Sequence, residues 1–425
     1  MKRTLIFAWA ILLIALSSVQ AQIKTTTVVP DRENHLYKVG ETVAFTVSAL
    51  NAQGQPVKEG KLIAVFRNDF RDELARQEIN LADANPAKIS RSFDKPGFLS
   101  VQVSGSGASA MAGVGFDPEK IEPGRPCPDD FDAFWAEGKK AAAALNSELQ
   151  LEEIPNLTTD KHTIYTVAVN TLHGKKSYGF LSVPKSEGKH PILVNVPGAG
   201  PGTGPDTWNV DRGFLVLNMN VFPYPVPLNG DERKKAYDEY NEKIQKEGYP
   251  RYCHYKAEDR ELYFFRDAYL GINEAIELVA ARPDADPDHM GLYGTSQGGA
   301  SALILGGLNG RFKAIVSNVP ALCDHCGCLL GRNSGWPKVL DAVKAPEAIQ
   351  AVQYTDGVNF ARKITCPIRV TVGFIDTTCS PSSVYAAFNV IPSGNKEIWN
   401  ETLLGHATGQ RARDAFNWLL EEFVK

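Results

Sequence analysis

The stretch "GLYGTSQGGASAL", residues 291–303, sets four glycines around one serine, between an apolar run and a helix-like segment. Gly294, Ser296 and Gly298 match the pattern G-x-S-x-G, which in a strand–turn–helix context holds a serine on a sharp, strained turn. Side chains in place of the two glycines would collide in such a turn. The stretch therefore predicts an exposed, nucleophilic serine, against the alternative of a strand–helix turn selected only for packing.

A base must accompany the serine, because a serine hydroxyl is a weak nucleophile and its base needs a carboxylate to orient it. In folds that use this turn the chain order is serine, acid, histidine. Two histidines follow Ser296, at positions 325 and 406. His406 lies in "LLGHATGQ" (403–410), a predicted loop between the last strand and the last helix, and we predict that it is the base. His325 lies in a cysteine-rich segment, where a structural or lid role is favoured.

The acid is expected directly after a strand that lies between the serine and the histidine. The segment "IRVTVGFIDTTCSP" (368–381) places Asp376 there, with a proline and a helix-like stretch beyond it. An aspartate at such a position can also act as a turn or helix-cap residue. Asp356 and Glu401 are weaker alternatives, because neither follows a strand and precedes a turn.

Two backbone donors should bind the oxyanion that forms when the serine attacks an ester. We predict the N–H of Gln297 as one donor, because Gln297 immediately follows the nucleophile. The other is predicted in the glycine-rich loop "NVPGAGPGTG" (195–204), at Ala199, with Gly200 as the alternative. A phosphate-binding loop is disfavoured here, since the stretch lacks the Gly-Lys-Ser/Thr ending that such a loop requires.

Strand-like runs alternate with helical ones from about residue 120 onward, which predicts an α/β fold. Several runs are nearly continuous in β-branched residues and leucine, as is typical of strands buried on both faces of a mostly parallel sheet. The longest helical stretch spans 259–283, and the long connections 219–257 and 321–363 are expected to form lids or to carry their own helices. Eight strands are predicted, at 163–170, 177–184, 190–198, 213–220, 289–294, 312–320, 368–376 and 396–401.

The N-terminal part has a different pattern, with short alternating runs separated by turn signals such as "NAQGQP" (51–56) and "DKPG" (94–97). It predicts a small antiparallel, Ig-like β-sandwich over 22–105, with no candidate catalytic cluster. "SGSGASAMAGVG" (104–115) is predicted to be a linker or an edge loop. The catalytic domain is predicted to span 106–425.

The first residues are typical of an export signal. Lys2 and Arg3 precede the apolar run Leu5–Leu16, and small residues lead up to a cleavage site after Ala21. A membrane anchor is disfavoured, because a span needs about 20 apolar residues. We predict a signal peptide over 1–21 and a periplasmic or secreted mature protein, and no other segment is apolar enough to suggest a membrane partner.

Charge and cysteine content narrow the partners further. The net charge of −4 argues against a nucleic-acid partner. Seven cysteines in an exported protein favour disulfides, and the odd number leaves at least one thiol unpaired. The cluster "CDHCGC" (323–328) lacks the second ligand pair of a structural zinc site. A disulfide or buried thiols are therefore predicted there, and neither a metal nor a cofactor.

Three segments resemble the acetyl xylan esterase and cephalosporin-C deacetylase group, carbohydrate esterase family 7: 291–324, 374–398 and 125–138. The resemblance covers roughly residues 120–425 and implies an α/β-hydrolase that removes acetyl groups from sugar hydroxyls through an acyl-enzyme, without metal. The implied partner is an acetylated carbohydrate or small ester. The family forms a ring-shaped hexamer, but the additional N-terminal sandwich argues against assuming that assembly here, and a homo-oligomer stays open. The resemblance implies that Ser296 is the nucleophile, Asp376 the acid and His406 the base. It also implies that Gln297 and Ala199 form the oxyanion hole.

The chain departs from the family pattern around the predicted pocket. The segment Pro197–Ala199 stands where His-Gly-Tyr is usual, and "NVFPYPVPLNG" (220–230) replaces an expected Arg-Gly-Gln. Ala407 replaces the glutamate that commonly follows the histidine. These changes alter the pocket walls and leave the three predicted catalytic residues intact, so a related carbohydrate or small-molecule ester, such as a pectin methyl ester, is an alternative substrate.

Two further functional hypotheses are weaker. A peptidase of the prolyl-oligopeptidase type would share the order of serine, acid and histidine, but residues 23–104 are too few for a propeller. A non-catalytic glycan-binding protein on a hydrolase fold has no reason to keep all three site residues. The sequence therefore favours an exported serine esterase that acts on carbohydrate.

Overall fold

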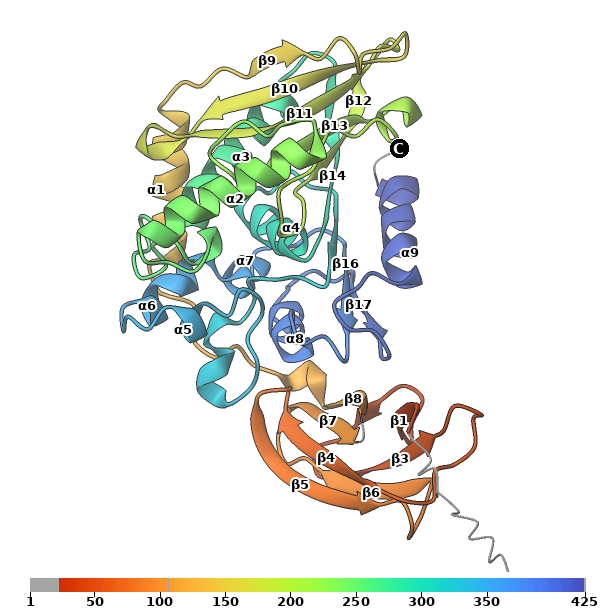
Figure 1. Cartoon of the computed structure of the whole chain (residues 1–425). Coiled ribbons are helices and arrows are strands. Elements are labelled where there is room, and N and C mark those ends of the chain that lie inside the picture. Colours follow the sequence, from red (N-terminus) through yellow and green to blue (C-terminus); the bar gives the residue numbers. More distant parts are fainter. Residues whose placement is uncertain (1–22, 106, 424–425) are drawn as a thin grey trace, which may run out of the picture.

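The chain builds a pair of small sheets at its N-terminus and one large sheet flanked by helices (Figure 1). The computed structural model describes residues 23–105 and 107–423. The predicted signal peptide, 1–21, lies outside the described residues. Of the helices in the described ranges, none is both long and apolar enough to cross a membrane.

The large sheet has the order β17-β16-β15-β14-β12-β13-β11-β10-β9. Neighbours from β17 to β13 are parallel, whereas β11, β10 and β9 pair antiparallel at one side. The strands are β9 (Gln150–Glu153), β10 (His162–Asn170), β11 (Lys176–Pro184), β12 (His190–Asn195), β13 (Leu215–Asn220), β14 (Ala285–Thr295), β15 (Ala314–Asn318), β16 (Ile368–Gly373) and β17 (Lys396–Glu401).

All eight predicted strands are present, and the mostly parallel α/β sheet is confirmed. The ninth strand, β9, was not predicted, and the prediction of an eight-stranded sheet was wrong by this one strand. Three of the four residues of β9 are exposed, so it has no apolar run to reveal it.

Helices cover both faces of the large sheet, which is why its central strands are apolar on both sides. Alternate residues of β12 belong to different apolar cores: Ile192 and Val194 pack with α3 and α4, and Leu193 packs with α9. The α-helices are α1 (Phe131–Ala143), α2 (Gly230–Lys246), α3 (Phe264–Ala280), α4 (Gln297–Leu308), α5 (Val339–Ala342), α6 (Ala348–Ala351), α7 (Gly357–Ala361), α8 (Pro381–Asn389) and α9 (Gln410–Trp418).

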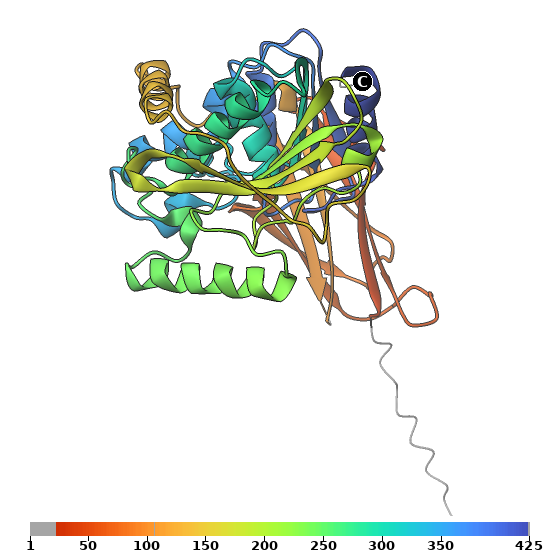
Figure 2. The same cartoon turned by 90° about the horizontal axis from the view of Figure 1, so that it is seen from above.

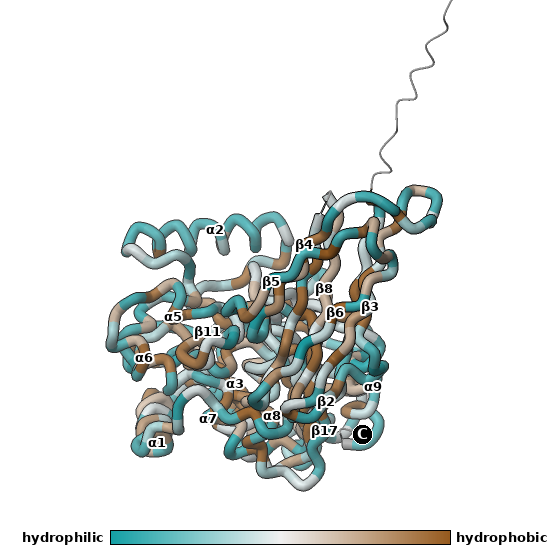
Figure 3. The backbone as a smooth tube through the Cα atoms, turned by 90° about the horizontal axis from the view of Figure 1, so that it is seen from below, coloured by the Kyte–Doolittle hydropathy of each residue, from teal (hydrophilic) through white to brown (hydrophobic). Residues whose placement is uncertain are grey.

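The two long connections carry helices of their own, as expected. The first contains α2, which runs along the outside of the molecule (Figure 2) and is hydrophilic over most of its length (Figure 3). Its tyrosines at 237 and 240 pack against Phe222, at the start of the same connection. The second connection, 321–363, contains α5, α6 and α7.

Two sheets at the N-terminus share one apolar core, in agreement with the predicted antiparallel sandwich. Among the strand pairs of the sandwich that the structure describes, only the short β2–β8 pair is parallel. One sheet has the order β1-β3-β6 and the other β2-β8-β7-β4-β5. The strands are β1 (Thr25–Pro30), β2 (Leu36–Tyr37), β3 (Thr42–Leu50), β4 (Lys61–Asn68), β5 (Asp72–Asn80), β6 (Ala87–Ser92), β7 (Gly97–Gly105) and β8 (Ala108–Phe116).

The prediction of a linker or edge loop at 104–115 was wrong, because most of this stretch forms β8. Strand β8 pairs antiparallel with β7 along its whole length. Ala112, Val114 and Phe116 on this strand are buried in the core of the sandwich. The sandwich sheet thus continues to Phe116, beyond the predicted domain boundary at residue 105.

Candidate active site

Ser296 occupies the turn between β14 and α4, at the edge of the sheet where the parallel strands end. Its φ of 61° and ψ of −119° lie in a region that non-glycine residues rarely adopt. The turn is held on both sides, because the Ser296 N–H donates to Asn318 O (2.9 Å) and its carbonyl accepts from Ala300 N (2.9 Å) and Ala321 N (3.0 Å). The surrounding structure therefore supports a strained backbone that presents the serine.

The glycines around Ser296 are required for space, as predicted. A Cβ atom on Gly294 would lie 2.2 Å from the carbonyl oxygen of Gly298. A Cβ atom on Gly298 would lie 2.1 Å from the carbonyl oxygen of Val196, at the end of β12. The helix start, the serine turn and the loop after β12 can approach this closely only without side chains at these two positions.

The structure brings Ser296, His406 and Asp376 into one chain of hydrogen bonds. His406 Nε2 lies 2.9 Å from Ser296 Oγ, and His406 Nδ1 lies 2.8 Å from Asp376 Oδ2. Asp376 follows β16 and is fully buried, whereas 29% of the His406 side chain is exposed, in the loop between β17 and α9. The other oxygen of Asp376, Oδ1, accepts from the N–H groups of Thr378 (2.7 Å) and Cys379 (2.9 Å). The carboxylate is thus oriented toward the imidazole ring.

The predicted oxyanion residues flank the serine turn. Gln297 is the first residue of α4, where backbone N–H groups have no partner within the helix. The loop after β12 touches the turn, since a Cβ on Gly198 would lie 3.8 Å from Ser296 Cβ. Ala199, the next residue, is exposed.

Tyr252 is a neighbour of this site that sequence reasoning missed. Its hydroxyl donates to the side-chain oxygen Oε1 of Gln297 at 2.5 Å, and both residues are buried. The tyrosine-rich composition of the connection 219–257 was the only signal for it. Burial raises the pKa of Tyr252 well above its usual range, so the hydroxyl keeps the proton that it donates.

Cys379 lies beside the histidine and the aspartate. Within the described residues, Cys379 Sγ, a carboxylate oxygen of Asp376 and a ring nitrogen of His406 lie within 4.8 Å of one another. Thiolate, imidazole and carboxylate are the donors that zinc prefers, but here the imidazole and the carboxylate already bind each other. Burial, with a smaller effect of the Asp376 charge, raises the pKa of the Cys379 thiol well above its usual range and keeps it neutral.

The weaker candidates for the acid have structural partners instead. Asp356 is buried and accepts the N–H groups of Asp324 (2.9 Å), His325 (2.7 Å) and Val358 (3.0 Å), so it caps α7. Burial and the nearby Asp324 charge raise its pKa to about 7. Glu401 Oε1 accepts from the N–H of Arg411 near the start of α9 (3.3 Å).

The cysteine cluster does not converge on one point. Cys323 Sγ donates to Ala321 O, Cys326 Sγ to Ile349 O and Cys328 Sγ to His325 O. His325 is fully buried, and burial lowers its pKa to about 3. All seven cysteines lie in the described ranges and are free thiols. Of the two predicted options, buried thiols are therefore found at 323 and 326, and no disulfide.

Comparison with known proteins identifies the family. The profile of the acetyl xylan esterase (AXE1) family matches residues 119–421. The acetyl esterase Axe7A of Xylanibacter ruminicola is 31% identical over 381 residues, which cover 87% of this chain and 84% of that protein. Because 87% of the chain exceeds what residues 119–425 supply, this match extends into the sandwich.

Two solved structures are also similar. Acetyl xylan esterase 1 from Thermoanaerobacterium sp. JW/SL YS485 is 25% identical, with a TM-score of 0.58, over 72% of this chain and 97% of that chain. The acetyl xylan esterase from Paenibacillus sp. R4, at 22% identity and a TM-score of 0.61, covers 72% and 98% and shares the fold. Together with the profile match over most of the chain, these similarities confirm the resemblance seen in the sequence: the chain belongs to the acetyl xylan esterase (AXE1) family of carboxylic-ester hydrolases.

Proposed function

We propose that this chain is an exported serine esterase that removes acetyl groups from carbohydrate, with Ser296 as nucleophile, His406 as base and Asp376 as the orienting acid. The observation that carries the proposal is the unbroken line of hydrogen bonds from the buried Asp376 carboxylate through His406 to the Ser296 hydroxyl. Family membership supports the ester chemistry, and the N-terminal sequence pattern supports export.

The reaction would begin with attack by Ser296 Oγ on the acetyl carbonyl carbon while His406 Nε2 accepts the hydroxyl proton. Asp376 keeps the proton of the ring on Nδ1 and stabilises the positive charge that forms on the imidazole. The N–H groups of Gln297 and Ala199 would bind the oxyanion. Collapse of the tetrahedral intermediate releases the sugar hydroxyl, which takes the proton from His406, and leaves an acetyl group on Ser296.

Water completes the cycle. His406 removes a proton from a water molecule, which attacks the acetyl-serine, and acetate leaves as Ser296 regains its proton. The strained turn supports both steps, because it holds the serine hydroxyl against the histidine before substrate arrives. The substrate class rests on the family and on relatives whose names specify acetyl xylan or acetyl esters. The altered loops at 197–199 and 220–230 would decide which acetylated sugar fits.

The test is the variant Ser296→Ala, assayed with p-nitrophenyl acetate and acetylated xylan. Loss of the nucleophile should reduce kcat by at least about 10³-fold, with an unchanged unfolding temperature. Ser186→Ala, which removes the same hydroxyl at an exposed turn, is the matched control and should retain full activity. Full activity of Ser296→Ala would refute the proposal.

A substrate panel tests the acyl group and the sugar. Acetate release is measured from acetylated xylan, acetylated pectin and cephalosporin C, and methanol release from methylated pectin. We expect acetate from at least one acetylated carbohydrate. Methanol release without any acetate release would instead support the methylesterase alternative.

A further inference from the structure

We propose that the N-terminal sandwich, together with the segment 117–130 that follows it, holds the loop that carries Asp376 in its active position. This loop, Phe374–Ser380, is called the acid loop below. The proposal rests on the proposed role of Asp376 and gives the sandwich a task in catalysis. Three sets of contacts, from separate parts of the sandwich and the segment, converge on the acid loop or on its supports.

The first contact is a direct approach of β8 and β7 to the start of the acid loop. A Cβ atom on Gly113 would lie 2.0 Å from the carbonyl oxygen of Phe374, two residues before Asp376. The Phe98 ring meets the Phe374 ring edge-on, with centroids 4.9 Å apart, and Phe98 belongs to the apolar core of the hydrolase part. His35 Nδ1 bonds to Gly113 O at 3.0 Å, and its ring centroid lies 6.4 Å from that of Phe374. Strand β8 therefore packs directly against the backbone at the start of the acid loop, with no room for a side chain at Gly113.

The second contact is a buried carboxyl group on the sandwich. Asp69 is fully buried and follows β4 with a φ of 46°. The hydroxyls of Ser382 and Ser380 and the guanidinium of Arg332 lie beside its carboxyl group. Ser380 ends the acid loop and Ser382 lies in the first turn of α8. Neither carboxyl oxygen of Asp69 nor the Ser382 hydroxyl has a hydrogen-bond partner among the described residues. Asp69 therefore packs the sandwich against the far end of the acid loop without bonding to it.

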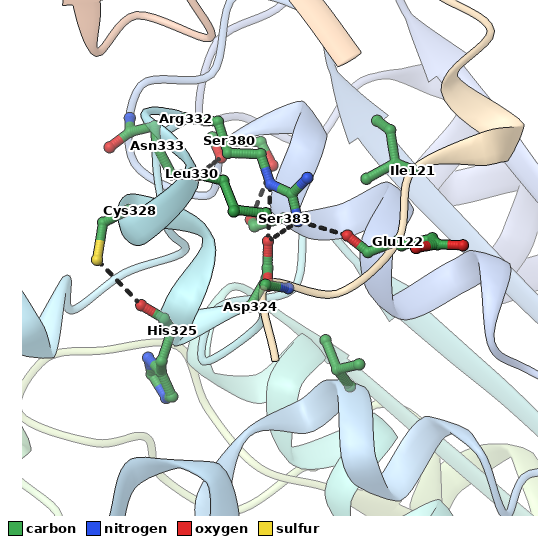
Figure 4. Close-up of polar contacts among 12 residues, drawn as sticks. Ile121, Glu122, Asp324, His325, Cys328, Leu330, Arg332, Asn333, Ser380 and Ser383 are labelled. Carbon is green, nitrogen blue, oxygen red and sulfur yellow. Dashed lines mark hydrogen bonds and ion pairs between the residues drawn. The ribbon is translucent and has the colours of Figure 1, made fainter. Parts of the chain in front are cut away.

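The third contact is a chain of polar interactions that begins in the segment 117–130 (Figure 4). The Gly124 N–H donates to Asp324 Oδ1 at 2.6 Å, and Arg332 Nη2 donates to Glu122 O at 2.5 Å. Asp324 and Arg332 form a buried ion pair, with Nε and Nη2 at 3.0 and 2.7 Å from Asp324 Oδ2. The segment is therefore bonded to both members of the ion pair.

Asn333, the residue after Arg332, links the ion pair to the acid loop. Its Nδ2 donates to Thr377 O at 3.3 Å, and its backbone carbonyl accepts from Ser380 Oγ at 2.8 Å. These bonds enclose Thr378 and Cys379, whose N–H groups orient the Asp376 carboxylate. A displacement of about 1 Å can reduce a rate about 10²-fold. Asn333 is therefore a positioning residue for Asp376.

The test on the sandwich side is Gly113→Val, which drives a side chain into the Phe374 carbonyl. We expect kcat for p-nitrophenyl acetate to fall at least tenfold, with KM changed less than twofold.

Ser109→Val is the matched control, because Ser109 lies on the same face of β8 as Gly113 but is exposed. Asn333→Ala is the second variant: it leaves the sandwich core untouched, and the same loss of kcat with KM changed less than twofold is expected. If the folded variants lose thermal stability but keep the wild-type kcat, the sandwich only stabilises the fold and the proposal is refuted. Ser296→Ala is measured separately, so a failure of the proposed function would be seen there.

Discussion

Gly298 is the position where the geometry of the serine turn makes its sharpest prediction. The change Gly298→Ala adds a single methyl group, 2.1 Å from the carbonyl oxygen of Val196. Val196 is followed by Pro197, Gly198 and Ala199, the loop that is proposed to supply the second oxyanion donor. The added methyl group must therefore push this loop away from α4, or push α4 and the serine turn away from the loop.

The expected losses of stability and rate follow from the overlap between the added methyl group and the carbonyl oxygen of Val196. Non-bonded heavy atoms are in favourable contact at about 3.5 Å, so a contact of 2.1 Å requires the two segments to separate by more than about 1 Å. Overpacking of this kind costs about 1–3 kcal/mol of stability. A misplacement of about 1 Å between a nucleophile and its oxyanion donors can reduce the rate about 100-fold, which corresponds to about 2.7 kcal/mol of lost transition-state stabilisation.

The assay is kcat/KM for p-nitrophenyl acetate, together with the unfolding temperature from a fluorescence melt. Gly310→Ala serves as the control, since a Cβ there meets nothing within 4 Å and the residue is exposed. We expect a loss of about 100-fold in Gly298→Ala and no change in Gly310→Ala. Activity within threefold of wild type in a normally stable Gly298→Ala protein would show that the steric reasoning is wrong.

Two more predictions concern groups around the site. Burial raises the pKa of Asp69 from 3.8 to about 7, so between about pH 4 and pH 7 the folded protein holds a proton that the unfolded chain releases, and stability falls as the pH rises through this range. Asp69→Asn should therefore raise the unfolding temperature relative to wild type more at pH 8 than at pH 4.5; an equal difference at both values would contradict this. Tyr252→Phe leaves Gln297 Oε1 buried without its donor, at about 1–3 kcal/mol, and should lower kcat about tenfold. Tyr263→Phe, which removes a buried hydroxyl bonded to Cys253 O, should lose similar stability without the loss of kcat.

The fold could be predicted where burial on both faces leaves a continuous apolar run. Strands such as β12 and β16 are buried along most or all of their length, and their sequences show it. Strand β9 could not be predicted, because only its backbone pairing with β10 makes it a strand. Strand β8 was misread as a linker for a related reason. Pairing with β7 makes it a strand, and the contact of Gly113 with Phe374 requires a glycine there, so its sequence has no long apolar run.

The site could be predicted where a local pattern carries it. Ser296 has its glycines beside it in sequence, and Asp376 and His406 each follow a strand of a parallel sheet, whose carboxyl ends meet at one edge. Tyr252 and Asn333 have no such local signal. Each makes one or two hydrogen bonds to a distant segment, and one sequence alone does not identify the residue at the other end.

The catalytic unit therefore does not begin at the boundary between the sandwich and the hydrolase part, the residues from 119 onward. The family profile starts at residue 119, yet Phe98 lies in the hydrolase core and Gly113 lies against the backbone that leads to Asp376. A ligand-presenting module on a flexible linker would not need a glycine fitted to an acid-bearing loop or a fully buried carboxyl group at the interface. Because these features are useful only when the two parts are held together, the unit that orients Asp376 includes the sandwich.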